Sequence, residues 1–200
     1  MIKFIKNVKK VLPYDRDEYI DFFGDHFYSY TEWFGVSFQL PGGYEGGNIS
    51  ETEYLEAYET WFKTVISQFG NSSLWTVNHD KRDLEWFPNE EDNLTNLRTL
   101  FEQNNIPDKF KGALVFTTDD LLMFSADLIT YPVAVFNKEG WLYSDLDISH
   151  NALPFIIKIS AHCNIDLLST DEDLLMEIVN KNSPDVFIRR GFGCLPRGEM

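Results

Sequence analysis

The sequence is poor in the residues and motifs on which most enzymes and nucleotide-binding proteins depend. It contains no HExxH zinc motif, no paired CxxC, no EF-hand loop and no Gly-Lys-Ser/Thr phosphate loop. Basic residues are scarce as well, since 17 Lys and Arg stand against 32 Asp and Glu and leave a net charge of −15. We therefore predict no catalytic residue, no metal site, no cofactor, and no nucleic-acid or anionic-membrane partner.

Long apolar runs and cysteines are also few. No stretch approaches the roughly 20 apolar residues of a membrane span, and lysines interrupt the first ten residues where a signal peptide would need an apolar core. The only cysteines, Cys163 and Cys194, are too few for a disulfide framework. We expect a cytoplasmic protein with reduced thiols.

The chain is rich in residues that build a core. Its 200 residues are 44% hydrophobic and include 17 Phe, 9 Tyr and 5 Trp. We expect a single globular domain over residues 1–200. The only plausible boundary, at 106–112, would give two packed lobes, 1–105 and 112–200, and is too short for a proper linker.

Hydrophobic spacing predicts an α+β fold, in which a mixed, mostly antiparallel sheet packs against several amphipathic helices. The helical period covers 17–33 and continues from the capping box of Ser50 and Glu53 to Phe69, with a strand over Phe34–Leu40 between them. From residue 112 onward strands and helices alternate. The strands predicted there are 112–116, 133–136, 141–146, 165–168 and 186–188, and the helices begin at Thr117 and Ser169.

Three segments rest on weaker patterns. Leu74–Val77 and Leu84–Phe87 flank a polar turn, which suggests a hairpin. Asn89 is expected to cap a helix that runs to about Asn104. Residues 151–163 fit a helix or a strand, and the helix is favoured.

Acidic residues are concentrated in one part of the chain. Residues 13–60 hold 11 Asp and Glu and a single basic residue, Arg16, interleaved with aromatic residues. Such a surface speeds encounter with a basic partner, and its aromatic side chains can anchor the contact, although the charge could serve solubility alone. The predicted partner-binding residues are Asp15, Asp17, Glu18, Asp21, Asp25, Trp33, Tyr44, Glu45, Glu56 and Glu59.

In overall character the chain resembles the immunity proteins that neutralise bacterial polymorphic or contact-dependent growth-inhibition toxins. The resemblance is carried by the acidic run from Asp15 to Glu59 and by the alternation of strands and helices from Gly112 to Ile188. It implies a protein–protein interaction in which one cognate toxin domain, often a basic nuclease, is bound stoichiometrically. Carboxylates would then take the place of phosphates against the Lys and Arg groups of the toxin.

Two other interpretations stay open. One is a small enzyme or ligand-binding domain with a site built from scattered polar residues near Asp145, Asp147 and His150, where two carboxylates and an imidazole lie close in sequence. The other is an adaptor or assembly protein without an inhibitory role. The adjacent His162 and Cys163 do not suggest a catalytic pair, because neighbouring residues point in different directions on a helix and on a strand.

Overall fold

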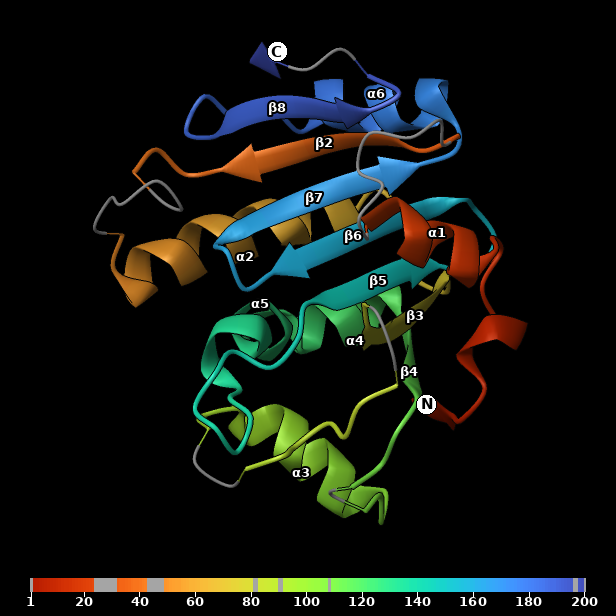
Figure 1. Ribbon diagram of the computed structural model, residues 1–200, viewed down its shortest axis with the longest axis vertical. Helices are drawn as coiled ribbons and strands as arrows, with labels where there is room; N and C mark the ends of the chain where they lie inside the picture. Colours follow the sequence, from red (N-terminus) through yellow and green to blue (C-terminus); the bar gives the residue numbers. More distant parts are fainter. Residues whose placement is uncertain are drawn as a thin grey trace.

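One antiparallel sheet organises the protein. The computed structural model describes residues 2–23, 32–42, 49–80, 83–89, 92–107, 109–195 and 198–199. Within these residues nine strands pair in the order β1-β4-β3-β5-β6-β7-β2-β8-β9, and every pairing is antiparallel (Figure 1). The strands are β1 (Lys3–Ile5), β2 (Phe34–Gln39), β3 (Leu74–His79), β4 (Ala113–Thr117), β5 (Leu146–His150), β6 (Phe155–Ser160), β7 (Asn164–Ser169), β8 (Ile188–Gly193) and β9 (Gly198–Glu199).

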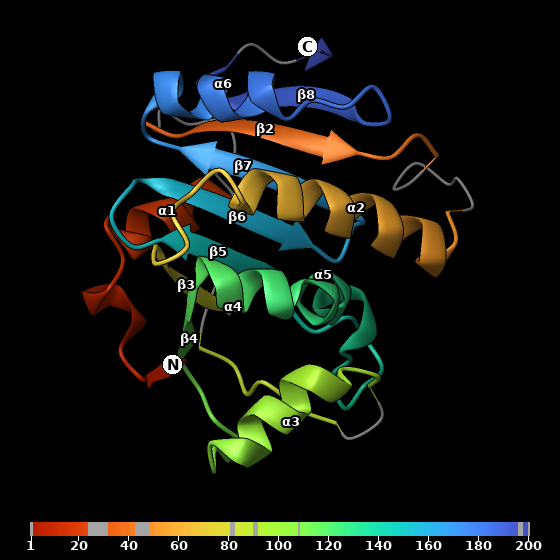
Figure 2. The same ribbon diagram turned by 180° about the vertical axis from the view of Figure 1, so that it is seen from behind.

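Helices cover the two faces of this sheet unequally. Helices α2, α4, α5 and α6 lie on one face, here called the helix face (Figure 2), whereas α1 lies on the other, the α1 face (Figure 1). The prediction of an α+β fold with an antiparallel sheet and several helices is confirmed. The helices are α1 (Arg16–Phe23), α2 (Glu51–Ile66), α3 (Thr95–Gln103), α4 (Thr118–Met123), α5 (Ser125–Ala134) and α6 (Glu172–Lys181), with a 3-10 turn at Val8–Lys10.

The main hydrophobic core lies between the helix face of the sheet and the helices that cover it. Strand β6 shows how the two faces differ: Ile157 and Ile159 enter this core, whereas Ile156 points to the α1 face. A second, smaller cluster on the α1 face joins Ile156 to side chains from α1, β7 and β8. Its buried members are Tyr19, Trp33, Ile156, Leu168 and Phe192.

The first and second halves of the chain share this sheet. Strand β2 pairs with β7 and β8, and β3 lies between β4 and β5. The strands of residues 1–105 are thus interleaved with those of 112–200, so these two segments do not form separate lobes. Gly35 of β2 is needed at this junction, because a Cβ there would lie 2.3 Å from the ring of Phe192.

Several local predictions are confirmed. Helix α2 begins with the capping box of Ser50 and Glu53, and α4 begins with the same motif at Thr117 and Asp120. Helix α6 starts close to the predicted place, but Asp171 rather than Ser169 caps it. Among the described residues no helix is long and apolar enough to cross a membrane.

The predicted hairpin of 74–77 with 84–87 is wrong. Both edges of β3 are taken by β4 and β5, so no edge remains for a second strand from the neighbouring sequence. Residues 84–87 enter the core instead: Trp86 is fully buried, and its Nε1 donates to the carbonyl oxygen of Gly112 at 3.0 Å. Glu85 pairs with Lys111 through an isolated β-bridge and an ion pair of 3.7 Å, not through a ladder.

Two apolar segments were assigned the wrong type of secondary structure. Residues 133–136 were expected to form a strand, but α5 continues to Ala134 with Pro132 inside its last turn. Residues 151–163 were expected to be helical, yet Phe155–Ser160 form β6 at the centre of the sheet. The strand is stable there because both of its faces are buried and because Asp80, Asp145 and Asp147 neutralise Lys158.

Other boundaries shift. Strand β5 begins at Leu146, where the predicted strand 141–146 ends, and β8 begins at Ile188, where the predicted strand 186–188 ends. Asn89 does not cap α3, whose N-cap is Leu94; the Asn89 amide donates to the carbonyl oxygens of Phe136 and Asn137 instead. Helix α1 begins at Arg16, and the part of the predicted helix 17–33 that covers 24–31 lies outside the described residues.

Candidate functional site

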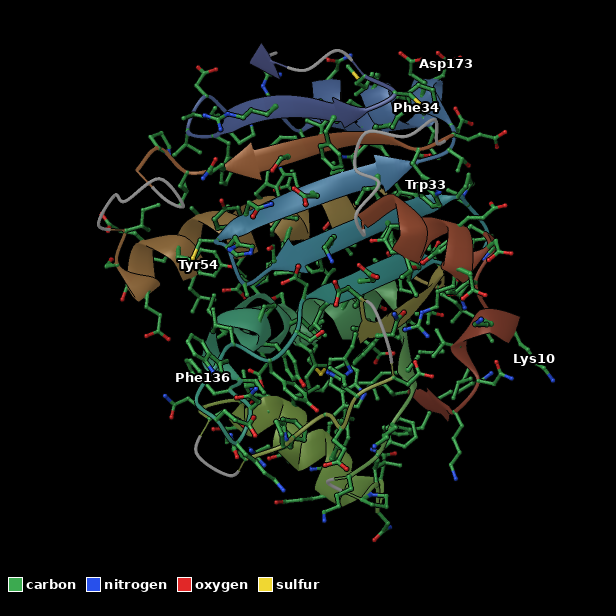
Figure 3. The ribbon with its side chains drawn as sticks, viewed as in Figure 1. Lys10, Trp33, Phe34, Tyr54, Phe136 and Asp173 are labelled. Atoms are coloured by element: carbon green, nitrogen blue, oxygen red, sulfur yellow. The ribbon has the colours of Figure 1, made fainter. Side chains whose placement is uncertain are left out.

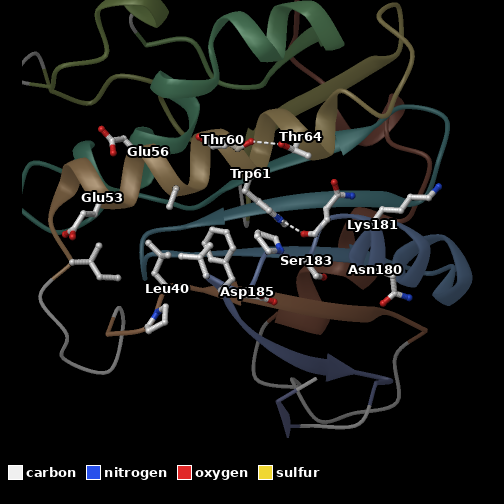
Figure 4. A pocket seen from close by; sticks show the side chains of 17 residues that line it. Leu40, Glu53, Glu56, Thr60, Trp61, Thr64, Asn180, Lys181, Ser183 and Asp185 are labelled. Atoms are coloured by element: carbon white, nitrogen blue, oxygen red, sulfur yellow. Dashed lines mark hydrogen bonds between the residues drawn. The ribbon is translucent and has the colours of Figure 1, made fainter.

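A groove opens on the helix face between α2 and the loop of residues 182–187 that joins α6 to β8 (Figure 4). Its volume is about 1130 Å³. Apolar side chains from both sides and from the end of β2 form its floor, which includes a half-exposed valine in the loop. The main floor residues are Leu40, Ile49, Ala57, Trp61, Val186 and Phe187.

The spacing of residues along α2 builds one wall of the groove. Glu53, Glu56, Thr60 and Thr64 recur every three or four residues and therefore share one side of the helix. Trp61, one position from this row, turns inward, with its ring 5.9 Å from that of Phe187 in the loop. The loop thus packs against α2 through buried aromatic rings.

Hydrogen bonds fix the opposite wall. Trp61 Nε1 donates to the carbonyl oxygen of Asn182 at 2.7 Å, as Figure 4 shows, and Asn182 Nδ2 donates to the carbonyl oxygen of Ile178 at 2.7 Å. Asn182 is 4% exposed, and its Oδ1 is a buried acceptor without a hydrogen-bond partner. The second bond fixes the amide orientation, since a flipped amide would set two acceptors against each other.

The rim of the groove is negative. Glu53, Glu56 and Asp185 line it and are exposed. Hydrogen bonds from the side chain and backbone of Ser50 lower the pKa of Glu53, so this carboxylate is ionised and held in place. Lys181, the one lysine among the described residues of the lining, forms an ion pair with Glu177. The groove can therefore bind apolar side chains on its floor and cationic groups at its rim.

Two of the predicted partner-binding residues lie on α2, and the groove uses one of them. Glu56 belongs to the rim of the groove. Glu59 is not part of its lining and instead contacts Lys63 Nζ at 2.7 Å and accepts from Ser125 Oγ at 2.7 Å. Although partial burial raises the pKa of Glu59, its bonds to Lys63 and Ser125 lower it below the ordinary value. The carboxylate of Glu59 thus connects α2 to α5.

The other described acidic residues of this set lie on the α1 face. Asp15 accepts from the backbone N–H of Asp17 and Glu18 at the start of α1, and Asp17 forms an ion pair with Lys9 at 2.6 Å. The structure therefore divides the acidic region of the sequence between opposite faces of the sheet, and no single surface contains all of it (Figure 1). The side chain of Asp21 and the predicted residues Asp25, Tyr44 and Glu45 lie outside the described residues.

Trp33, which was predicted to bind the partner, is buried. It is 4% exposed, and its ring lies 5.2 Å from the rings of both Tyr14 and Tyr19 in the cluster on the α1 face (Figure 3). Its position directly before the apolar alternation of β2 favours such a packing role.

A buried charge cluster lies on the α1 face, and sequence reasoning missed it. Lys158 Nζ contacts Asp80 Oδ2 at 2.9 Å, Asp145 Oδ2 at 3.2 Å and Asp147 Oδ1 at 3.8 Å. The Tyr19 hydroxyl donates to Asp147 Oδ1 at 2.8 Å, which connects α1 to the cluster. The signal in the sequence was Lys158 in the middle of the apolar run Phe155–Ile159. If such a run forms a buried strand, the charge of its lysine requires buried counter-ions.

Burial changes the proton affinity of this cluster. It raises the pKa of Asp147 to about 7, against the effect of nearby Lys158. Burial alone would lower the pKa of Lys158, but Asp147 and Asp80 raise it above its ordinary value. Asp147 Oδ2 and Asn78 Oδ1, which belong to paired residues of β5 and β3, are buried acceptors without a hydrogen-bond partner.

The alternative site near Asp145, Asp147 and His150 is not assembled. The two aspartates meet at Lys158, but the His150 ring lies in contact with Trp75 and Phe69, with ring centroids 4.8 and 5.4 Å away. His150 stands three residues from Asp147 on β5 and thus points to the opposite face of the sheet. Among the described residues, no three of His, Cys, Asp and Glu are placed to hold a metal ion.

Comparisons of the chain with protein-family models, curated proteins and solved structures gave no match. The groove is therefore interpreted from its own geometry and charge.

Proposed function

We propose that this chain is an immunity protein that acts in the bacterial cytoplasm, where it binds and neutralises a cognate basic toxin domain. The observation that carries the proposal is the groove between α2 and the 182–187 loop, whose apolar floor is bordered by Glu53, Glu56 and Asp185. An apolar centre with a charged border is the usual anatomy of a protein–protein contact. Neutralisation by occlusion needs no catalytic group in this chain.

In this proposal, charge raises the association rate of the two proteins, and contacts in the groove lower the dissociation rate of the complex. A net charge of −15 attracts a basic domain over several ångströms of solvent. Once the surfaces meet, carboxylates at the rim pair with Lys or Arg of the toxin, and apolar side chains of the toxin cover the accessible part of the floor at Ile49, Ala57 and Val186.

The test is co-expression of the chain with the product of the adjacent upstream reading frame. We expect the two proteins to co-purify in a one-to-one complex and the chain to rescue growth of cells that express the toxin. The association rate should fall steeply between about 0.05 and 0.5 M salt, where the screening length becomes shorter than about 10 Å. A chain that neither binds this product nor protects the cells would contradict the proposal.

A further inference from the structure

We infer that the groove binds one segment of the partner in which an apolar side chain stands between two arginine or lysine residues, and that the α1 face takes no part in the contact. The inference rests on the proposed function and names the surface and the chemistry of its occupant.

The arrangement of charge around the groove sets the pattern of this segment. Glu53 and Glu56 border it on the α2 side, and Asp185 borders it on the loop side, with the apolar floor between them. Lys181 is already paired with Glu177. A cation on each side of an apolar residue therefore meets a carboxylate, whereas an acidic segment would bring like charges together.

The volume of the groove indicates a segment rather than a single side chain. At about 1130 Å³ it lies just above the roughly 300–1,000 Å³ range of small-molecule pockets. Val186 on its floor is 49% exposed, so apolar surface is available for an occupant to cover.

The carboxylates of the rim favour arginine over lysine. Arginine carries five N–H donors in a planar fork that matches the two oxygens of a carboxylate, as on Glu53, Glu56 and Asp185. Lysine offers a single compact charge and forms no such two-bonded pair.

The described part of the α1 face offers less to such a segment. The hollow beside Asp15 and Asp17 measures about 500 Å³, against about 1130 Å³ for the groove. Asp17 is paired with Lys9, and Asp15 accepts from backbone N–H groups of α1. Carboxylates that are already engaged give steering but little binding energy, so this face supplies the matched control.

Three synthetic peptides of one length, with blocked ends and leucine alternating with arginine, lysine or glutamate, test the inference. The readout is the NMR signal of the Trp61 indole N–H, which bonds to the 182–187 loop, together with the backbone amides of that loop. We expect the arginine peptide to shift these signals with the highest affinity, the lysine peptide to bind more weakly and the glutamate peptide not to bind. Equal shifts with the glutamate peptide, or shifts confined to α1, would overturn the inference.

Charge reversal identifies the surface. The double variant Glu56→Lys with Asp185→Lys should weaken arginine-peptide binding by at least about tenfold, which is about 1.4 kcal/mol. Both residues are exposed and have no hydrogen bond or ion pair to another described residue, so the melting temperature should stay unchanged. The control, Asp17→Lys with Glu18→Lys, should change the affinity by less than about threefold.

The same two variants separate this inference from the proposed function. If the toxin domain still co-purifies with the groove variant at unchanged affinity but is lost with the α1 variant, the groove inference fails and the immunity function stands. If the peptides bind as expected but no partner from the neighbouring reading frame binds, the groove stands and the immunity function fails.

Discussion

Carboxylates on the two faces of the sheet behave in opposite ways. On the helix face, Glu53 is exposed, and its bonds to Ser50 lower its pKa, so it presents a fixed negative charge to solvent. On the α1 face, Asp147 is buried, and the loss of water raises its pKa to about 7. Solvent and partners, rather than residue type, decide whether a carboxylate is available to another molecule.

The same contrast separates binding from stability. The exposed carboxylates of the groove rim can be changed with little effect on the fold, whereas the buried ones around Lys158 hold β5, β6 and α1 together. Four substitutions sharpen this contrast, from the largest expected effect to the smallest.

Replacement of Lys158 by Met should have the largest effect. It removes the contacts of Lys158 with Asp80 and Asp145, and loss of one member of a buried ion pair costs about 3–5 kcal/mol. Urea unfolding at neutral pH measures the loss. The control is Lys63→Met, whose partner Glu59 lies on the surface of α2, and its cost should stay below about 1 kcal/mol. Equal stability of the two variants would show that the cluster does not hold the strands together.

Tyr19→Phe should destabilise the protein by about 1–3 kcal/mol, because it removes a donor from a buried carboxyl group. The ring contacts with Trp33 remain. Tyr14→Phe removes a bond between two hydroxyls, Tyr14 and Ser149, and should cost about 0.5–1.5 kcal/mol. Thermal unfolding of both variants checks the order, and the reverse order would contradict a role of Asp147 in docking α1.

Asp147→Asn should change the pH dependence of stability. Because the pKa of Asp147 rises from 3.8 to about 7 on folding, the folded state keeps a proton that the unfolded chain has released. The contribution is fully present below pH 3.8 and is lost as the pH rises through about 7. Removal of this carboxyl should reduce the slope of unfolding free energy against pH in that window by up to about 1.4 kcal/mol per unit.

A neighbouring carboxyl provides the control for this profile. Burial raises the pKa of Asp166 to about 6, so Asp166→Asn should flatten the slope only up to that pH. Urea titrations at half-unit steps of pH distinguish the two, and identical profiles for Asp147→Asn and the unchanged protein would rule out a proton on Asp147.

Ser50→Ala tests the helix face and should have the smallest effect. The loss of a helix N-cap costs about 1 kcal/mol, and it should also let the pKa of Glu53 return toward its ordinary value. Thermal unfolding measures the first effect, and NMR titration of Glu53 measures the second. An unchanged Glu53 titration would show that Ser50 does not hold this carboxylate.

The class of the fold and several of its local elements follow from the sequence. The capping boxes at Ser50 and Thr117 mark the starts of α2 and α4, and the alternation of Phe34–Gln39 marks β2, because each signal involves residues within a few positions of one another. The acidic region was visible in the same way, and Glu56 of the groove rim came from it.

Only the tertiary structure determined the contacts between residues that are distant in the sequence. The strand at Phe155–Ser160 exists because β5 and β7 satisfy its backbone and because Asp80, Asp145 and Asp147 neutralise Lys158. Likewise, the sheet separates Asp17 from Glu56, and the groove appears only where residues 40–41 and 49–64 meet 180–187. Hydrophobic periodicity indicates which side of a helix or strand is apolar. Which element packs against that side depends on the topology of the chain, and no local pattern encodes the topology.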